Sequence, residues 1–150
     1  IEAEIDAMPH ISQRDLGLKM TDPADAARFV ARTRVDAFAV VIGNIHGGQA
    51  TGEKLDFTLL KKINAVVNVP LVLHGASNLP KAQLKKAINY GVRKINIDTQ
   101  LRTAATTAIR KILKDKKITD PRDYWDSARS AMTTVVVEAA TEFGSRGKSG

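Results

Sequence analysis

The sequence contains no cysteine, and aromatic residues make up only 5% of its 150 residues. The absence of cysteine excludes a disulfide framework and thiolate metal ligands, and it favours a cytoplasmic protein. No apolar run is long enough to cross a bilayer, so we expect no membrane-spanning segment. The chain opens with Ile1 rather than methionine, which favours a natural protein that is longer at its N-terminus.

The chain is basic, with a formal net charge of +7. Such a charge is compatible with nucleic acid, a membrane surface or an anionic small molecule as a partner. The basic residues are spread through predicted helices, and no basic stripe interleaved with aromatic residues is present. We therefore expect a solvated basic face and no nucleic-acid or membrane partner, with a salt-sensitive nucleic-acid binder as a distant alternative.

The periodicity of apolar residues alternates along the chain between that of strands and that of helices. Strands are predicted at 1–6, 37–42, 70–73 and 92–97. Helices are predicted to begin at Pro23 after Asp22, near Asp56, at Pro80 and near Thr99, and a last helix at 124–143. Four βα units and a C-terminal helix predict an α/β protein with a parallel sheet, either half of a (β/α)8 barrel or an open four-stranded sheet.

Polar side chains follow the predicted strands at the points where ligands bind in parallel βα proteins. Glu4, His46 and His74 each stand at such an end, and a glycine follows both histidines. Two imidazoles and a carboxylate form a plausible zinc site. The alternative is that the two histidines only form hydrogen bonds with loop backbone.

The segments after the last two strands carry small and hydroxyl residues that suit a phosphate. These residues are Gly75, Ala76 and Ser77 after one strand, and Asn96, Ile97, Asp98 and Thr99 after the other. Barrels commonly bind phosphate in the loops after their seventh and eighth strands, through backbone N–H and hydroxyl groups. Gly47 could contribute from the preceding loop. The alternative interpretation makes Ser77 and Thr99 simple helix caps.

Five segments taken together resemble the class II, metal-dependent fructose- and tagatose-bisphosphate aldolases. They read IEAEI at 1–5, VIGNIHG at 41–47, PLVLHGAS at 70–77, VRKINIDT at 92–99 and DPRDYWDSARSAMTTVVVEAATEFGS at 120–145. The resemblance runs along nearly the whole chain. It implies a TIM-type (β/α)8 barrel, of which this chain carries the second half, from the fifth strand to the C-terminal helix.

The resemblance also implies an activity and a set of site residues. It implies reversible, metal-assisted aldol cleavage of a ketose bisphosphate, in which zinc or another divalent metal polarises the ketone and stabilises an enediolate. Glu4, His46 and His74 fall on metal-ligand positions. The family positions that hold the dihydroxyacetone phosphate part of the substrate are occupied here by Gly47, Gly75, Ser77, Asn96, Asp98 and Thr99. Family members commonly form dimers or tetramers, and Arg102 or Arg129 is a candidate for the second phosphate.

The chain departs from the family in two places. The first four strands, which carry another histidine ligand and the aspartate that acts as general acid, have no counterpart. In the loop after 1–6, Ser12 falls near the position of the family's glutamate, and Asp15 or His10 is a weak substitute. The chain alone is therefore expected to be nearly inactive. Its partner is expected to be an N-terminal half-barrel or a second copy; the alternative is a non-catalytic, self-associating half-barrel or a sugar-phosphate-binding module.

Overall fold

A computed structural model of the chain describes residues 1–5, 19–45 and 54–148. The chain divides into two compact units, Ile1–Asn96 and Ile97–Gly150, which are described in turn. None of the helices in the described ranges is long and apolar enough to span a bilayer.

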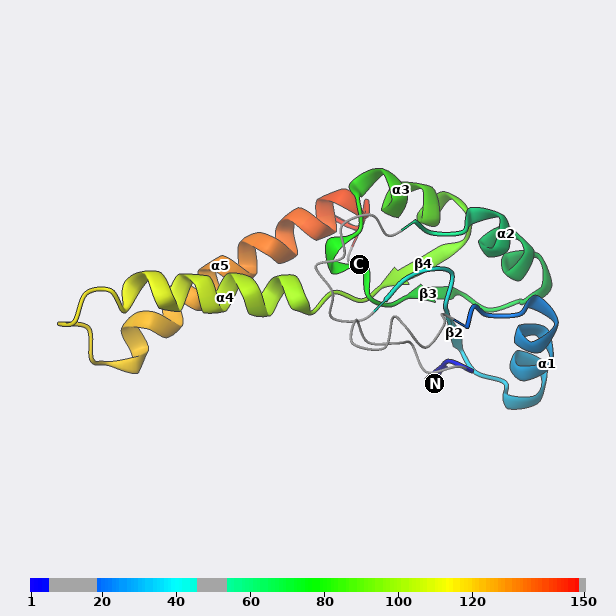
Figure 1. The fold of residues 1–150 in the computed structure, drawn as a ribbon, viewed down its shortest axis with the longest axis horizontal. Helices are drawn as coiled ribbons and strands as arrows, with labels where there is room; N and C mark the ends of the chain where they lie inside the picture. The colour runs from blue at the N-terminus through cyan, green and yellow to red at the C-terminus, as the bar shows by residue number, and fades with distance from the viewer. Residues whose placement is uncertain (6–18, 46–53, 149–150) are drawn as a thin grey trace. The chain divides into compact units, whose positions relative to one another are not determined.

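The first unit is a parallel sheet with helices in the connections between its strands (Figure 1). The strands, in sheet order, are β1 (Glu2–Ala3), β2 (Ala37–Val40), β3 (Leu71–Leu73) and β4 (Val92–Ile95). The helices are α1 (Pro23–Thr33), α2 (Phe57–Val66) and α3 (Lys81–Asn89), with a short 3-10 helix, η2 (Ala76–Asn78), after β3. The predicted α/β class is confirmed. The strands follow one another in sequence order, as in a barrel wall, whereas a doubly wound open sheet reverses its order at a switch point.

Helices α1 and α2 each begin after an aspartate that caps them. Asp22 accepts hydrogen bonds from the N–H groups of Ala24 and Asp25, and Pro23 is the first helical residue of α1. Asp56 caps α2 in the same way by accepting from the Leu59 N–H. The core lies between sheet and helices. Its largest fully buried side chains include Phe38, Leu60, Ile63, Leu71 and Leu73.

Strand β2 ends at Val40, whereas the sequence predicts a strand that continues to residue 42. Beyond Val40, backbone N–H groups donate to side chains and no longer to a neighbouring strand. Thr21 Oγ1 accepts the Val41 N–H at 2.9 Å, and Asn44 Oδ1 accepts the Ile42 N–H at 2.8 Å. The other predicted strands, 1–6, 70–73 and 92–97, are likewise shorter than their apolar patterns suggest.

Strands β3 and β4 pair with an irregularity that changes which way β4 presents its side chains. Leu71 pairs with Val92, but the next residue, Val72, pairs with Lys94, so Arg93 is an extra residue. Leu71 and Val72 point to opposite faces, and paired residues share a face. The bulge therefore places Lys94 on the opposite face from Val92, which a regular strand would not do.

The second unit is a pair of packed helices, α4 (Thr99–Ile112) and α5 (Pro121–Glu142). Helix α5 begins at Pro121, three residues before the predicted start. Asp120 accepts a hydrogen bond from the Arg122 N–H at 2.9 Å, which repeats the Asp-Pro signal of α1. The predicted stop near Gly144 is confirmed, since this glycine has a φ of 73° just after the helix.

Candidate functional site

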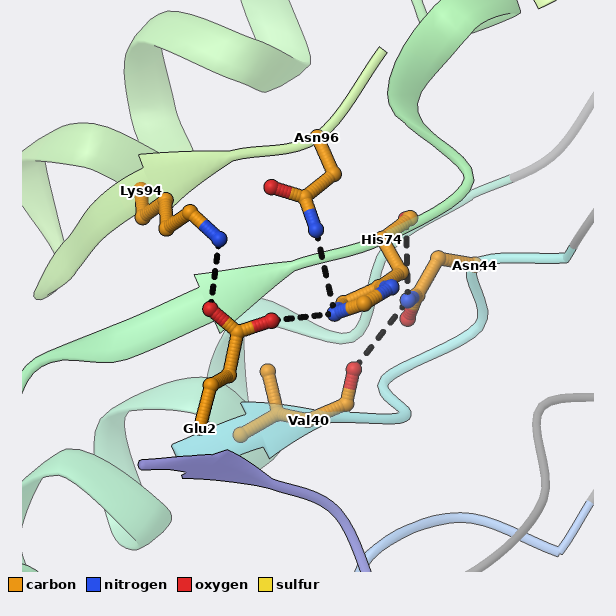
Figure 2. A network of polar contacts seen from close by, with 6 residues as sticks. All are labelled: Glu2, Val40, Asn44, His74, Lys94 and Asn96. Atoms are coloured by element: carbon orange, nitrogen blue, oxygen red, sulfur yellow. Dashed lines mark hydrogen bonds and ion pairs between the residues drawn. The ribbon is translucent and has the colours of Figure 1, made fainter. Parts of the chain in front are cut away.

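A polar network joins three strands on one face of the sheet (Figure 2). Glu2 comes from β1, His74 directly follows β3, Lys94 lies in β4 and Asn96 directly follows β4. His74 Nε2 is 3.0 Å from Glu2 Oε1, and Lys94 Nζ donates to Glu2 Oε2 at 2.6 Å. The Asn96 amide nitrogen lies 3.4 Å from His74 Nε2. Glu2 thus uses one carboxylate oxygen for an imidazole and the other for an ammonium group.

The carboxylate of Glu2 is held in its charged form by its neighbours. Its side chain is 26% exposed, and that of His74 is 20% exposed. The hydrogen bond from Lys94, assisted by the one to His74, lowers the pKa of Glu2 below its ordinary value, although partial burial opposes this shift. The site therefore presents a charged carboxylate to the imidazole.

A second set of contacts fixes the backbone at the end of β2 and just after β3, next to this network. Asn44 is fully buried, and its amide nitrogen donates to the carbonyl oxygens of Val40 at 3.1 Å and His74 at 3.2 Å. Gly75 has a left-handed φ of 63°, and a Cβ there would lie 2.4 Å from the Ile45 carbonyl oxygen. Only glycine fits at this contact between two strand-end loops.

The small residues predicted to bind phosphate form a short turn of helix. Ala76 and Ser77 are buried in η2, which Gly75 precedes. The N-cap of α3 is Pro80, so Ser77 does not cap that helix. The turn therefore places the Ser77 hydroxyl two residues beyond Gly75, in the segment that directly follows His74.

The remaining predicted phosphate residues are divided between the two units. Asn96 closes the first unit, and its N–H donates to the Leu73 carbonyl at 2.9 Å. Ile97, Asp98 and Thr99 open the second unit, where Asp98 occupies the N-cap of α4 and Thr99 is the first helical residue. Thr99 is therefore not the cap that the alternative interpretation assumed.

Both arginines predicted for a second phosphate have a carboxylate neighbour on their own helix. Arg102 pairs with Asp98 at 2.7 Å, and Arg129 pairs with Asp126 at 2.8 Å. All four side chains are well exposed, so these contacts are weak.

The predicted metal ligands are only partly described. Glu4 is exposed just beyond β1, whereas Glu2, two residues earlier, contacts His74. His46 and Gly47 lie outside the described residues, as does Asp15. In the ranges that the structure covers, no three histidine, aspartate or glutamate side chains are grouped closely enough to hold a metal.

Sequence reasoning missed the roles of Glu2 and Lys94. The strict alternation of residues 1–6 places Glu2 on the same face as Glu4, which was a signal for the first. No comparable signal existed for Lys94. Its orientation depends on the bulge at Arg93, which the apolar pattern of the strand does not reveal.

Comparison with known proteins gives consistent results. A family model described as class II fructose-bisphosphate aldolase matches residues 1–148. The crystal structure of the YdjI aldolase from Escherichia coli K12 is 36% identical with a TM-score of 0.77, and the match covers 99% of this chain and 49% of that one.

Two further solved structures agree. A putative fructose-1,6-bisphosphate aldolase from Coccidioides immitis is 28% identical with a TM-score of 0.86, covering 98% of this chain and 53% of that one. The fructose-bisphosphate aldolase of Campylobacter jejuni is 25% identical with a TM-score of 0.74, covering 96% and 51%. The chain thus spans about half the length of these proteins, which agrees with the predicted partial barrel.

Proposed function

The chain belongs to the class II fructose-bisphosphate aldolase family, and from that premise we propose that it supplies the metal-ligating and phosphate-binding half of an aldolase site. The proposed reaction is reversible cleavage of a ketose bisphosphate, most simply fructose bisphosphate, to dihydroxyacetone phosphate and a triose-phosphate aldehyde. One observation carries the proposal: His74, which directly follows β3, meets the Glu2 carboxylate of β1 beside Asn96, which directly follows β4.

The donor chemistry of this site fits a divalent metal, which we propose to be zinc. Imidazole and carboxylate groups are ligands of catalytic zinc sites, and a ligating histidine usually donates its other ring N–H to a partner such as a carboxylate, a backbone carbonyl or water. Glu2 provides that partner for His74. The proposed ligands are His74, His46 and Glu4. When bound, the metal supplies Lewis-acid polarisation of the substrate ketone.

The residues of the chain have separate tasks in this proposal. Glu2 fixes the tautomer and the ring plane of His74, because the carboxylate accepts a hydrogen bond from Nε2. Lys94 holds the second oxygen of Glu2, so the carboxylate cannot rotate freely. Asn96 presents its amide beside the imidazole, where it can donate to a substrate oxygen.

The phosphate of the dihydroxyacetone phosphate part is proposed to bind at the turn after β3. Backbone N–H groups of a tight turn after a strand form an anion-binding concavity, and the Ser77 hydroxyl adds a donor. The complete proposed set consists of Gly47, Gly75, Ala76, Ser77, Asn96, Ile97, Asp98 and Thr99.

The proposal requires a second half-barrel for full activity. The family's general acid has no counterpart in this sequence, and its loss costs about 10²–10⁴-fold in rate. An N-terminal half-barrel, on the same longer protein or on another chain, would supply it; a second copy of this chain would complete the barrel wall without supplying it.

Calorimetric titration of the metal-free chain tests the proposal. We expect zinc to bind, and a dihydroxyacetone phosphate enediolate mimic to bind only when zinc is present. Both events should be lost in His74→Ala and in His46→Ala. Absence of specific zinc binding would refute the metal-site proposal for this chain, and full aldol-cleavage activity of the chain alone would refute the argument that its site is incomplete.

A second candidate is a non-catalytic half-barrel that self-associates. The observation in its favour is that, within the described residues, β1 and β4 each pair on one side only, and unpaired strand edges favour association. Light scattering distinguishes the two candidates when it is combined with the zinc titration. Self-association without zinc or mimic binding would favour the second candidate.

A further inference from the structure

We propose that Asn44 is a positioning residue for His74, because its side chain ties the end of β2 to the backbone of His74. Asn44 follows β2 by four residues and is 30 residues before His74. Its side chain is fully buried, although asparagine is seldom buried unless its amide is hydrogen-bonded. The reason for its burial is therefore to be found in its partners.

Both ends of the Asn44 amide are engaged with backbone, and Figure 2 shows the two hydrogen bonds of its nitrogen. The oxygen accepts the Ile42 N–H at 2.8 Å, and the nitrogen donates to Val40 O at 3.1 Å and to His74 O at 3.2 Å. Val40 is paired with Leu73 at the last step of the β2–β3 ladder. The Asn44 amide therefore continues the link between β2 and β3 to His74, one residue beyond the last strand pair.

The glycine that follows His74 supports the same arrangement through a second backbone contact. Gly75 packs against the Ile45 carbonyl so closely that no Cβ can be accommodated. The peptide between His74 and Gly75 is thus held by Asn44 at its oxygen and by the Ile45 backbone at the next α-carbon. With its backbone fixed, His74 has only its side-chain torsions left, and Glu2 restrains the imidazole.

The consequence for function rests on the proposed metal site, whereas the positioning itself does not. Loss of a group that orients a metal-ligating histidine typically lowers metal affinity about 10- to 100-fold. Asn44 acts through the backbone rather than on the ring, so we expect an effect at the lower end of that range.

The experiment compares Asn44→Ala with a matched control, Thr21→Val. Each variant removes a buried side-chain acceptor from a neighbouring N–H just after β2, that of Ile42 or of Val41. Only Asn44 also contacts His74. The chain has three histidines, so a long-range nitrogen–proton NMR spectrum resolves the ring of His74, assigned with His74→Gln. Zinc affinity is measured by calorimetry on the same samples.

We expect Asn44→Ala to shift the His74 ring signals and to weaken zinc binding about tenfold. Thr21→Val should lose stability but leave both readouts unchanged. A folded Asn44→Ala chain with wild-type ring signals would overturn the proposal, as would equal changes in Thr21→Val. If the wild-type chain binds no zinc, the proposed function fails, and the ring signals alone still decide the role of Asn44.

If the Asn44→Ala chain does not fold, hydrogen exchange in the wild-type chain tests the proposal instead. The side-chain amide protons of Asn44 should then exchange with solvent about a hundredfold more slowly than those of an exposed asparagine. Exchange at the rate of a free amide would overturn the proposal.

Discussion

Glu2 and Lys94 lie on the two opposite edge strands of the sheet, yet their side chains form an ion pair of 2.6 Å. Neighbouring strands are about 4.8 Å apart, so the edges of a flat four-stranded sheet are separated by about 14 Å. The contact is explained if the sheet curls toward this face, as the wall of a barrel does. The concave face is therefore the one that carries His74 and Asn96.

Replacement of Lys94 should change the charge state of Glu2. The Lys94 hydrogen bond is the largest cause of the lowered pKa of Glu2, so Lys94→Met should raise that pKa toward its ordinary value. Lys94→Arg, which keeps the charge, is the control and should leave the pKa low. An NMR titration of the Glu2 carboxyl carbon measures both, and an unchanged pKa in Lys94→Met would contradict the assigned cause.

The same ion pair predicts a contribution to stability in weak acid. Glu2 has a lowered pKa in the folded chain, so its stabilising effect is present above its ordinary value of 4.5 and is lost as pH falls through the lowered pKa. The difference in free energy of unfolding between wild type and Glu2→Gln should therefore shrink from about pH 6 to about pH 3. Urea unfolding followed by circular dichroism measures it. A difference that stays constant with pH would show that the Glu2 charge does not contribute.

Glu2 of β1 and Glu4 just beyond it should both affect zinc binding, but to different degrees. Glu2→Gln should weaken binding about tenfold, because it loosens the orientation of His74. Glu4→Gln should weaken it more, because the proposal makes Glu4 a direct ligand. Calorimetric titration with zinc compares the two variants. Wild-type affinity in Glu4→Gln would remove that residue from the ligand set, and the structure would then leave Glu2 as the better candidate.

Substitution of Gly75 should destabilise the chain beyond the cost of its backbone conformation. Gly75 and Gly144 have similar positive φ values, 63° and 73°, so alanine at either position costs about 1–2 kcal/mol. At Gly75 the new Cβ would also meet the Ile45 carbonyl at 2.4 Å, whereas no atom lies within 4 Å at Gly144. Urea unfolding should show a further loss of about 1–3 kcal/mol for Gly75→Ala. Equal losses would mean that the two loops are not in close contact.

Much of the fold was predictable because its signals are local. The caps at Asp22 and Asp56 act on N–H groups two or three residues away. The stop at Gly144 depends only on the conformation of one residue. Strand and helix periods likewise depend on near neighbours, which is why the α/β class and the order of its units followed from the sequence. The start of α5 differs from the prediction because Asp120 caps the helix and Pro121 begins it, three residues before the predicted start.

The sequence by itself placed His74 at the end of a strand, followed by a glycine and small residues. It could not place Glu2, Lys94 or Asn44 around that histidine. Those contacts join residues 72, 92 and 30 positions apart along the chain. They depend on strand register, on one extra residue at Arg93 and on the curl of the sheet. These are properties of strands packed together, so only the tertiary structure decided which polar groups surround His74.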